Sequence, residues 1–170
     1  GEQCLNKLNG MFSFAIWNKK EQFLFAARDR FGVKPFYYSF DSINFIFASE
    51  INSLWAAGIP EIPNDTVWLN YFAEGSYGMP DETFWMGIKQ LSGWHCLTLK
   101  DNSLQIKKWY HFEERIAELQ NHFEDNEEEY ITQLRVKAIN LRFRADVPIG
   151  FNLSGGLDSS TLLALIDQQN

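Results

Sequence analysis

One segment near the end of the chain constrains the fold more than any other. Residues 146–153 predict a turn and a buried strand, residues 154–160 a glycine-containing loop, and residues 161–166 a helix. A lone strand–helix unit cannot bury both of its faces, because a parallel sheet needs further strands and helices around it. The segment therefore predicts the opening unit of a parallel-sheet domain. Since the chain starts at Gly1 on a helical pattern and stops at Asn170 soon after this unit, we expect a fragment cut at both ends.

The loop in this segment has the residue types of an anion-binding site. Gly155 and Gly156 permit positive φ and let the backbone approach a ligand without a Cβ clash. The unpaired N–H groups at the start of the following helix favour negative charge. Asp158 would repel a bare phosphate, so it indicates either a magnesium ion or a role in orienting the loop. Hydroxyl donors are supplied by Ser154, Ser159 and Ser160.

The loop differs from two commoner phosphate-binding loops, because it lacks the lysine of the Walker A pattern and the third glycine of the dinucleotide fingerprint. It resembles instead the PP-loop, S-G-G-x-D-S, of enzymes that cleave ATP between the α and β phosphates. The resemblance implies that this loop binds the pyrophosphate end of ATP and that Leu153 touches the nucleotide through its backbone. The implied ATP-binding residues are Leu153, Ser154, Gly155, Gly156, Asp158 and Ser159. The resemblance also implies an indirect contact of Asp158 with Mg²⁺. The alternatives are a plain glycine turn for the loop and a core position for Leu153.

Most of the remaining chain predicts antiparallel sheet. Apolar, β-prone runs separated by polar turns cover residues 11–17, 23–27, 36–40 and 45–48. A further hairpin is predicted to join residues 94–99 to residues 104–109. Apolar residues on both faces of the first strands predict a sheet that is covered on both sides.

The connection at residues 28–35 is predicted to be structural. Gly32 and Pro35 are expected to shape it, and Arg28 is expected to pair with Asp29 or another nearby carboxylate.

Helix signals lie between and after these strands. Ser49 predicts the cap of a short helix that Gly58 ends, and Asn64 or Asp65 predicts the cap of a second. Residues 82–91 form a short amphipathic stretch or a loop.

A strongly acidic stretch covers residues 113–129, which indicates a solvated linker or an exposed helix surface. Asn126 is then the predicted cap of a helix that runs through Arg144, with Glu129 completing a capping box. Arg142 and Arg144 complement the negative end of that helix.

Two separate sets of motifs resemble the glutamine-hydrolysing asparagine synthetase family. Residues 146–150 and 157–160 resemble the start of its synthetase domain, and three earlier segments, 8–15, 28–38 and 47–51, resemble the later part of its glutaminase domain. The implied fold is α+β and then α/β. It consists of the C-terminal part of an N-terminal-nucleophile-type αββα glutaminase domain, followed by the first strand–PP-loop–helix of a parallel-sheet synthetase domain. The implied ranges are 1–112 for the glutaminase part, 113–125 for an acidic linker and 126–170 for the synthetase part.

The resemblance implies a ligase with two coupled reactions. Glutamine is hydrolysed in one domain, and ammonia passes to the other, where aspartate, ATP and Mg²⁺ form β-aspartyl-adenylate and then asparagine. The family's N-terminal cysteine nucleophile belongs upstream of Gly1, so no catalytic residue is assigned in this chain and the 170 residues alone are expected to be inactive. Glutamine, aspartate and ATP are the implied partners, and a homodimer of the full-length protein is allowed. Five residues are expected to be structural, surface or strand-end positions: Cys4, Cys96, His95, His111 and His122.

Composition narrows the remaining choices. A formal net charge of −7 gives no overall attraction for nucleic acid or anionic lipid. Two cysteines without a CxxC pair fit a reducing compartment, and no run is long enough to span a membrane, so we expect a cytoplasmic protein. Two alternatives stay open: a related PP-loop amidotransferase or cyclising synthetase acting on another carboxylate, and a non-catalytic amidotransferase-like scaffold.

Overall fold

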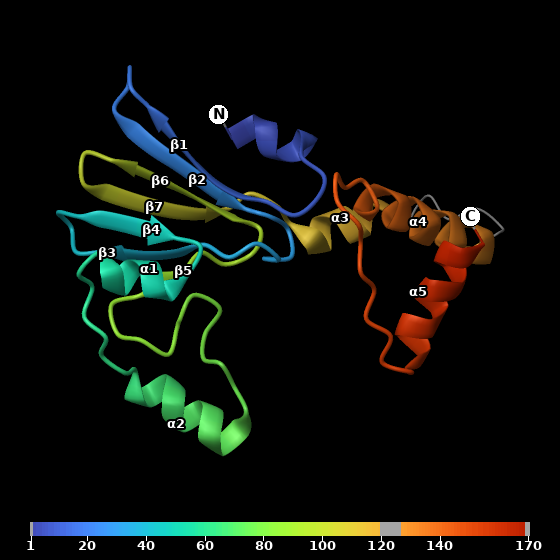
Figure 1. The fold of residues 1–170 in the computed structure, drawn as a ribbon. Coiled ribbons are helices and arrows are strands. Elements are labelled where there is room, and N and C mark those ends of the chain that lie inside the picture. Colours follow the sequence, from blue (N-terminus) through green and yellow to red (C-terminus); the bar gives the residue numbers. More distant parts are fainter. Residues whose placement is uncertain (1, 120–126, 169–170) are drawn as a thin grey trace. The chain divides into compact units, whose positions relative to one another are not determined.

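A computed structural model describes residues 2–119 and 127–168 (Figure 1). Its internal contacts divide the chain into two compact units, Gly1–His111 and Phe112–Asn170, which are described separately below. The expectations for Gly1, His122, Asn126 and Asn170 lie outside the described residues.

The first unit contains two antiparallel sheets. The first sheet has the order β1-β2-β6-β7, built from β1 (Ser13–Asn18), β2 (Phe23–Arg28), β6 (His95–Lys100) and β7 (Ser103–Lys108). The second sheet has the order β4-β3-β5, built from β3 (Tyr37–Phe40), β4 (Phe45–Ala48) and β5 (Lys89–Gln90). The predicted hairpins are confirmed, and their division between two sheets is consistent with the αββα fold that the resemblance implies.

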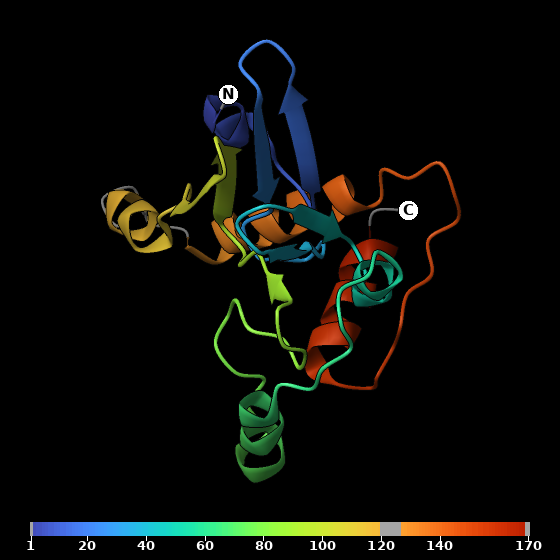
Figure 2. The same ribbon diagram turned by 90° about the vertical axis from the view of Figure 1, so that its left-hand side faces the viewer.

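The core of this unit lies between the two sheets. Ala26 and Leu97 of the first sheet pack in one buried cluster with three residues of the second sheet and its flanks: Phe36, Tyr38 and Leu91. On its other face the first sheet packs against a 3₁₀ helix, η1 (Glu2–Lys7), through the fully buried Leu5. The helix α1 (Ile51–Ala56) contacts β3 and β4 of the second sheet. The unit is therefore layered as helix, sheet, sheet, helix, as both views show (Figures 1 and 2).

The two sheets are joined by two chain crossings, one from β2 to β3 and one from β5 to β6. The crossings touch at Gly32 and Gly93, where a Cβ added to Gly93 would lie 2.8 Å from the backbone nitrogen of Gly32. Gly32 adopts a φ of +63°, so the predicted role of this glycine in shaping the connection is confirmed.

Helix ends in this unit agree only partly with their sequence signals. The prediction that Ser49 caps α1 is wrong, because the helix starts one residue later and Glu50 is its N-cap, without a side-chain cap bond. Gly58 follows the end of α1 at a φ of +96°, and its N–H donates to Trp55. The prediction for Gly58 is therefore confirmed.

The second predicted cap in this unit is also present. The helix α2 (Asp65–Glu74) begins after Asn64, whose side chain accepts the N–H of Val67 at 3.4 Å. Of the two candidate caps, Asn64 is the one used.

The second unit contains three helices in the residues that are described: α3 (Phe112–Leu119), α4 (Glu127–Arg142) and α5 (Leu157–Asp167). The acidic stretch therefore begins as a helix. Arg142 donates to the carbonyl of Ala138 at 3.4 Å, which confirms its predicted contact with the end of α4. The helices α4 and α5 contact each other.

The strand predicted within residues 146–153 does not form. The residues between α4 and α5 are irregular, and Ile149, Phe151 and Leu153 are 43%, 39% and 55% exposed. A strand needs a neighbour to pair its backbone groups, and the described part of the second unit contains no other strand. The prediction of a buried strand over residues 146–153 is therefore wrong for this structure, although the residues are apolar as the pattern indicates.

No helix among the described residues has both the length and the apolar character needed to cross a membrane.

Candidate functional site

The loop before α5 adopts part of the geometry that its sequence predicts. Gly155 has a φ of +78°, in the left-handed region, whereas Gly156 is the N-cap of α5 at a φ of −77°. Of the two glycines, only Gly155 uses the conformational freedom expected of both. The helix begins at Leu157 without any side-chain cap bond, so the first-turn N–H groups are not covered by a side chain. This arrangement suits an anion at the helix start.

The serine hydroxyls of the loop form a chain among themselves. Ser159 donates to the carbonyl of Gly156 at 3.1 Å, Ser154 and Ser159 share a hydrogen bond of 3.0 Å, and the N–H of Gly156 donates to Ser154 at 3.3 Å. Because Ser159 donates to a carbonyl, Ser154 is the donor between the two hydroxyls. Both hydroxyl hydrogens therefore point at protein atoms. To donate to a ligand, as the sequence predicts, these hydroxyls have to rotate.

The other members of the predicted set lie at the surface. Asp158 is exposed in the first turn of α5, and Leu153 is 55% exposed in the irregular segment. Since Leu153 is not buried, the alternative of a core position for it does not hold in this structure. The described residues contain no group of three or more histidine, cysteine, aspartate or glutamate side chains that could hold a metal ion. A single carboxylate beside a phosphate ligand is nevertheless the kind of contact by which proteins hold Mg²⁺, so Asp158 fits an indirect contact with a metal–nucleotide complex.

In the first unit, the most tightly bonded polar groups are Arg28 and Asp29. The Arg28 guanidinium donates at 2.6 Å to each of three backbone carbonyls, those of Gly32, Lys34 and Leu91. The first two acceptors belong to one crossing between the sheets and the third belongs to the other. Arg28 thus ties the two crossings together from the end of β2. Burial lowers the pKa of this guanidinium, while the charge of Asp29 acts in the opposite direction.

Asp29 is 1% exposed and accepts four backbone N–H groups, those of Phe12, Phe31, Val33 and Lys34. Burial alone would raise the pKa of this carboxyl, but the four N–H donors outweigh it and lower the pKa. The prediction that Arg28 pairs with Asp29 or another carboxylate is wrong. Both side chains form their hydrogen bonds with backbone atoms. The residue types alone do not indicate such partners.

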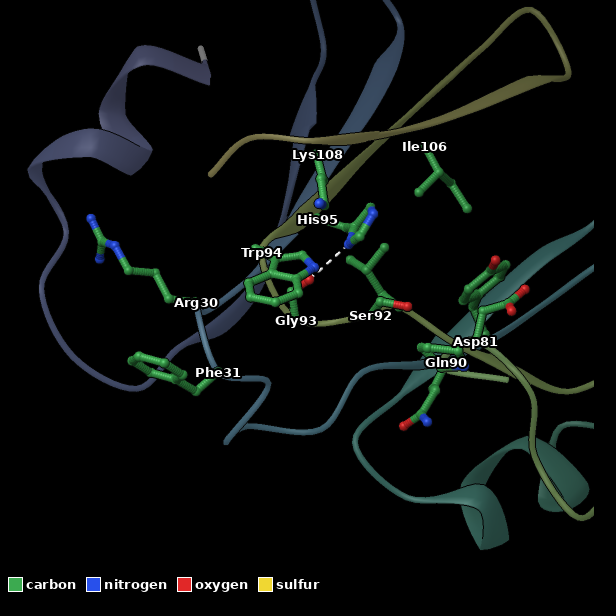
Figure 3. A pocket seen from close by; sticks show the side chains of 13 residues that line it. Arg30, Phe31, Asp81, Gln90, Ser92, Gly93, Trp94, His95, Ile106 and Lys108 are labelled. Carbon is green, nitrogen blue, oxygen red and sulfur yellow. Dashed lines mark hydrogen bonds between the residues drawn. The ribbon is translucent and has the colours of Figure 1, made fainter. Parts of the chain in front are cut away.

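An open cavity of about 700 Å³ lies beside the crossings in the first unit (Figure 3). Its walls include Phe31, Trp94 and Ile106 as well as the basic side chains of His95 and Lys108. No motif in the sequence predicted a site at this position. The register of the hairpin could have indicated it, because a turn at residues 100–103 places His95 directly opposite Lys108.

Both cysteines are placed as structural residues. Cys96 is fully buried in the core beneath η1, and burial, with the nearby charge of Glu2, raises the pKa of its thiol to about 11. Cys4 lies in η1 and packs against the same core. Cys96 lacks the exposed surroundings of a reactive thiol.

Two known domains match the chain in sequence. A glutamine amidotransferase domain matches residues 1–110, and an asparagine synthase domain matches residues 131–170. The matched ranges fall in the first and the second compact unit respectively.

Curated relatives match along nearly the whole chain. Asparagine synthetase [glutamine-hydrolyzing] 3 of Bacillus subtilis is 36% identical over 174 residues, which cover 96% of this chain and 26% of that protein. Putative asparagine synthetase [glutamine-hydrolyzing] 2 of Methanocaldococcus jannaschii is 36% identical over 178 residues, 98% of this chain and 32% of that protein. Amidase chyE of Penicillium rubens is 31% identical over 171 residues, 98% of this chain and 24% of that protein.

The chain thus spans between 24% and 32% of the length of these relatives. Two antiparallel sheets packed face to face, with a helix outside each, occupy the range that the first domain covers. The chain therefore belongs to the family of proteins that contain this glutamine amidotransferase domain.

Proposed function

We propose that this chain is part of a glutamine-hydrolysing asparagine synthetase, an AMP-forming ligase. The order of the two domain matches carries this proposal: a glutamine amidotransferase domain precedes an asparagine synthase domain within 170 residues. Two of the three relatives named above carry the name asparagine synthetase, which favours this function over a scaffold. The partners of this activity are glutamine, aspartate and ATP, and a homodimer and a cytoplasmic location belong to the same proposal.

In this proposal the first unit is part of an N-terminal-nucleophile-type glutaminase domain. Its layering of helix, sheet, sheet and helix supports that assignment. Residues 1–112 belong to this domain, residues 113–125 link it to the next, and residues 126–170 begin a PP-loop synthetase domain. The catalytic cysteine of the glutaminase reaction is not assigned to either cysteine of this chain.

The loop Ser154–Ser159 would bind the pyrophosphate end of ATP, with the backbone of Leu153 beside the nucleotide. An oxygen of the aspartate side chain attacks the α-phosphorus, the bond from that phosphorus to the bridging oxygen breaks, and pyrophosphate leaves with the electron pair. The first-turn N–H groups of α5, which no side chain caps, are suited to hold the negative charge that develops on the β-phosphate. Mg²⁺, when bound through Asp158 and the phosphates, would neutralise part of that charge. Ammonia from glutamine then displaces AMP from the acyl-adenylate.

The test uses the full-length protein and aspartate-dependent exchange of pyrophosphate into ATP. The variant Asp158→Ala should abolish this exchange and leave glutamine hydrolysis intact. Asp167→Ala, which removes an exposed carboxylate in the last turn of the same helix, is the matched control and should keep both activities. Undiminished exchange in Asp158→Ala would contradict the assignment of the loop. Exchange that depends on a carboxylic acid other than aspartate would contradict the assignment of the substrate.

A further inference from the structure

Two basic side chains face each other across the β6–β7 hairpin at the wall of the cavity. His95 and Lys108 are direct partners in the antiparallel register, so both side chains lie on the same face of the first sheet. Figure 3 shows them together at the cavity. Neither forms an ion pair with a carboxylate within the described part of the chain, and Asp81, in the same cavity wall, is bonded to Lys89 at 3.0 Å. Two basic groups directly opposite one another repel when both are charged, so the site has a deficit of negative charge.

Both side chains are held in place by the residues around them. The Lys108 ammonium lies 5.2 Å from the centre of the Trp94 ring. The Nδ1 atom of His95 lies 2.7 Å from the carbonyl of Gly93, and because a carbonyl can only accept, Nδ1 carries the hydrogen. The Nε2 atom can then accept a hydrogen bond when the ring is neutral, and it can donate one to a carboxylate when the ring carries a second proton.

The backbone at Trp94, next to His95, is strained, and hydrogen bonds hold it in that conformation. Trp94 adopts a φ of +53°, a conformation that bulky residues rarely adopt. Two backbone hydrogen bonds hold it there. The N–H of Trp94 donates to the backbone carbonyl of Asp29 at 2.9 Å, and its carbonyl accepts from the N–H of Trp109 at 2.9 Å. Strained backbone that the surrounding structure enforces occurs most often at binding sites.

The rest of the cavity determines which anion fits. Phe31 is 74% exposed and Ile106 is 43% exposed in the cavity wall, so an apolar group can cover them. Inorganic phosphate carries no apolar group that could cover these side chains, so the cavity wall favours an anion with an apolar part. We propose that this cavity binds a carboxylate between Lys108 and His95, with the apolar part of the same ligand against Trp94, Phe31 and Ile106. The carboxylate comes either from a small organic acid or from an acidic side chain of the polypeptide. The residues of this cavity are not among those predicted to bind ATP, and the inference does not depend on the proposed function.

Benzoate is the probe for the first source, because it joins one carboxylate to an apolar ring. Titration calorimetry on the full-length protein should show that benzoate binds, whereas its uncharged analogue benzamide and inorganic phosphate do not. The variant Lys108→Met, which keeps the aliphatic stem, should weaken benzoate binding at least tenfold. Lys107→Met is the matched control and should leave binding unchanged, since Lys107 forms its ion pair with Glu2 on the opposite face of the sheet.

The second source is tested by carbodiimide coupling of the same protein. If an acidic side chain already fills the site, benzoate does not bind, and mass spectrometry should find Lys108 coupled to an aspartate or glutamate from outside the cavity. Either result supports a carboxylate site and identifies its occupant. Absence of both benzoate binding and such a cross-link, coupling of Lys108 to Asp81 alone, or equal loss of binding in the Lys107 and Lys108 variants would overturn the proposal.

Discussion

Arg28 and Asp29 are oppositely charged neighbours that do not bond to each other. The guanidinium donates to backbone carbonyls of both crossings between the sheets, and the carboxylate accepts backbone N–H groups around the first crossing. The Arg28 side chain therefore satisfies backbone carbonyls, and the Asp29 side chain satisfies backbone N–H groups. Together they hold the connection between the sheets in place. Arg28 and Asp29 are only 8% and 1% exposed, so water cannot replace these hydrogen bonds.

Replacing Asp29 with asparagine should destabilise the first unit by about 3 kcal/mol, because one acceptor oxygen and an NH₂ group cannot serve four buried N–H donors. Urea unfolding of the full-length protein, followed by a probe in the amidotransferase domain, measures this loss. Asp41→Asn is the control. Asp41 also accepts backbone N–H groups, but it is exposed and water can replace the bonds, so its loss should be smaller. A smaller effect at Asp29 than at Asp41 would refute this account.

The same carboxylate should make stability depend on pH at the acid end. Its folded-state pKa is lowered, so its contribution is fully present above the unfolded-state pKa of about 3.9 and is lost as pH falls through the folded value. We expect the free energy of unfolding to decline below about pH 4. In Asp29→Asn the decline should be shallower over that range. Parallel curves for the two proteins would show that Asp29 contributes nothing to it.

Arg28→Lys should also destabilise this unit by about 3 kcal/mol, although the charge is kept. One ammonium cannot reproduce the planar fork that reaches three carbonyls, and at least one buried acceptor loses its partner. Arg115→Lys is the matched control, because the ion pair of Arg115 within the described residues is with the exposed Glu118, and its replacement should change stability little. Thermal unfolding of the two variants compares them directly. Equal, small shifts would mean that the bonds of Arg28 are replaceable.

Alanine substitutions at the two loop glycines should distinguish the effect of backbone strain from the effect of steric crowding. Gly155→Ala forces a Cβ into the left-handed region, at a cost of about 1 kcal/mol, although no atom lies within 4 Å of that Cβ. Gly156→Ala keeps an ordinary φ but brings a Cβ to 3.3 Å from the Ser154 hydroxyl. We therefore expect Gly155→Ala to reduce pyrophosphate exchange at every ATP concentration by altering the loop. A fully active Gly155→Ala would show that positive φ at this residue is dispensable.

The two cysteines should differ in reactivity in the folded protein. With a thiol pKa of about 11, Cys96 is a thiolate in only about one molecule in a thousand at pH 8, and it is fully buried. Iodoacetamide should therefore label Cys4 well before Cys96, as peptide mass spectrometry can show. In urea the two should react at similar rates. Comparable labelling in the folded protein would mean that the first sheet opens readily beneath η1.

Local signals predicted most of the elements of this fold. The hairpins that contain β1, β2, β6 and β7 were predicted because alternation and turn residues lie within a short stretch of chain. The Asn64 cap was predicted for the same reason. By contrast, the Ser49 cap was wrong by one residue, since serine and glutamate at the helix start give competing signals.

Long-range contacts account for what the sequence did not reveal. The resemblance implied two sheets, but it did not show where their connections meet, because Gly32 and Gly93 are 61 positions apart and give no joint signal in one sequence. The backbone acceptors of Arg28 and the left-handed φ of Trp94 have the same origin. The site residues Ser154 to Ser159 could be proposed from sequence because their motif is contiguous. The strand before them was not correctly predicted because its formation requires partner strands.

The contact between Gly32 and Gly93 has a mechanical consequence. Main chain meets main chain there, so peptide dimensions fix the separation of the layers at that point, whatever side chains fill the interior. A core substitution that changes volume can then widen or narrow the sandwich only away from the crossing. The two sheets should rotate relative to each other about this contact, and the edge strand β4 should move most.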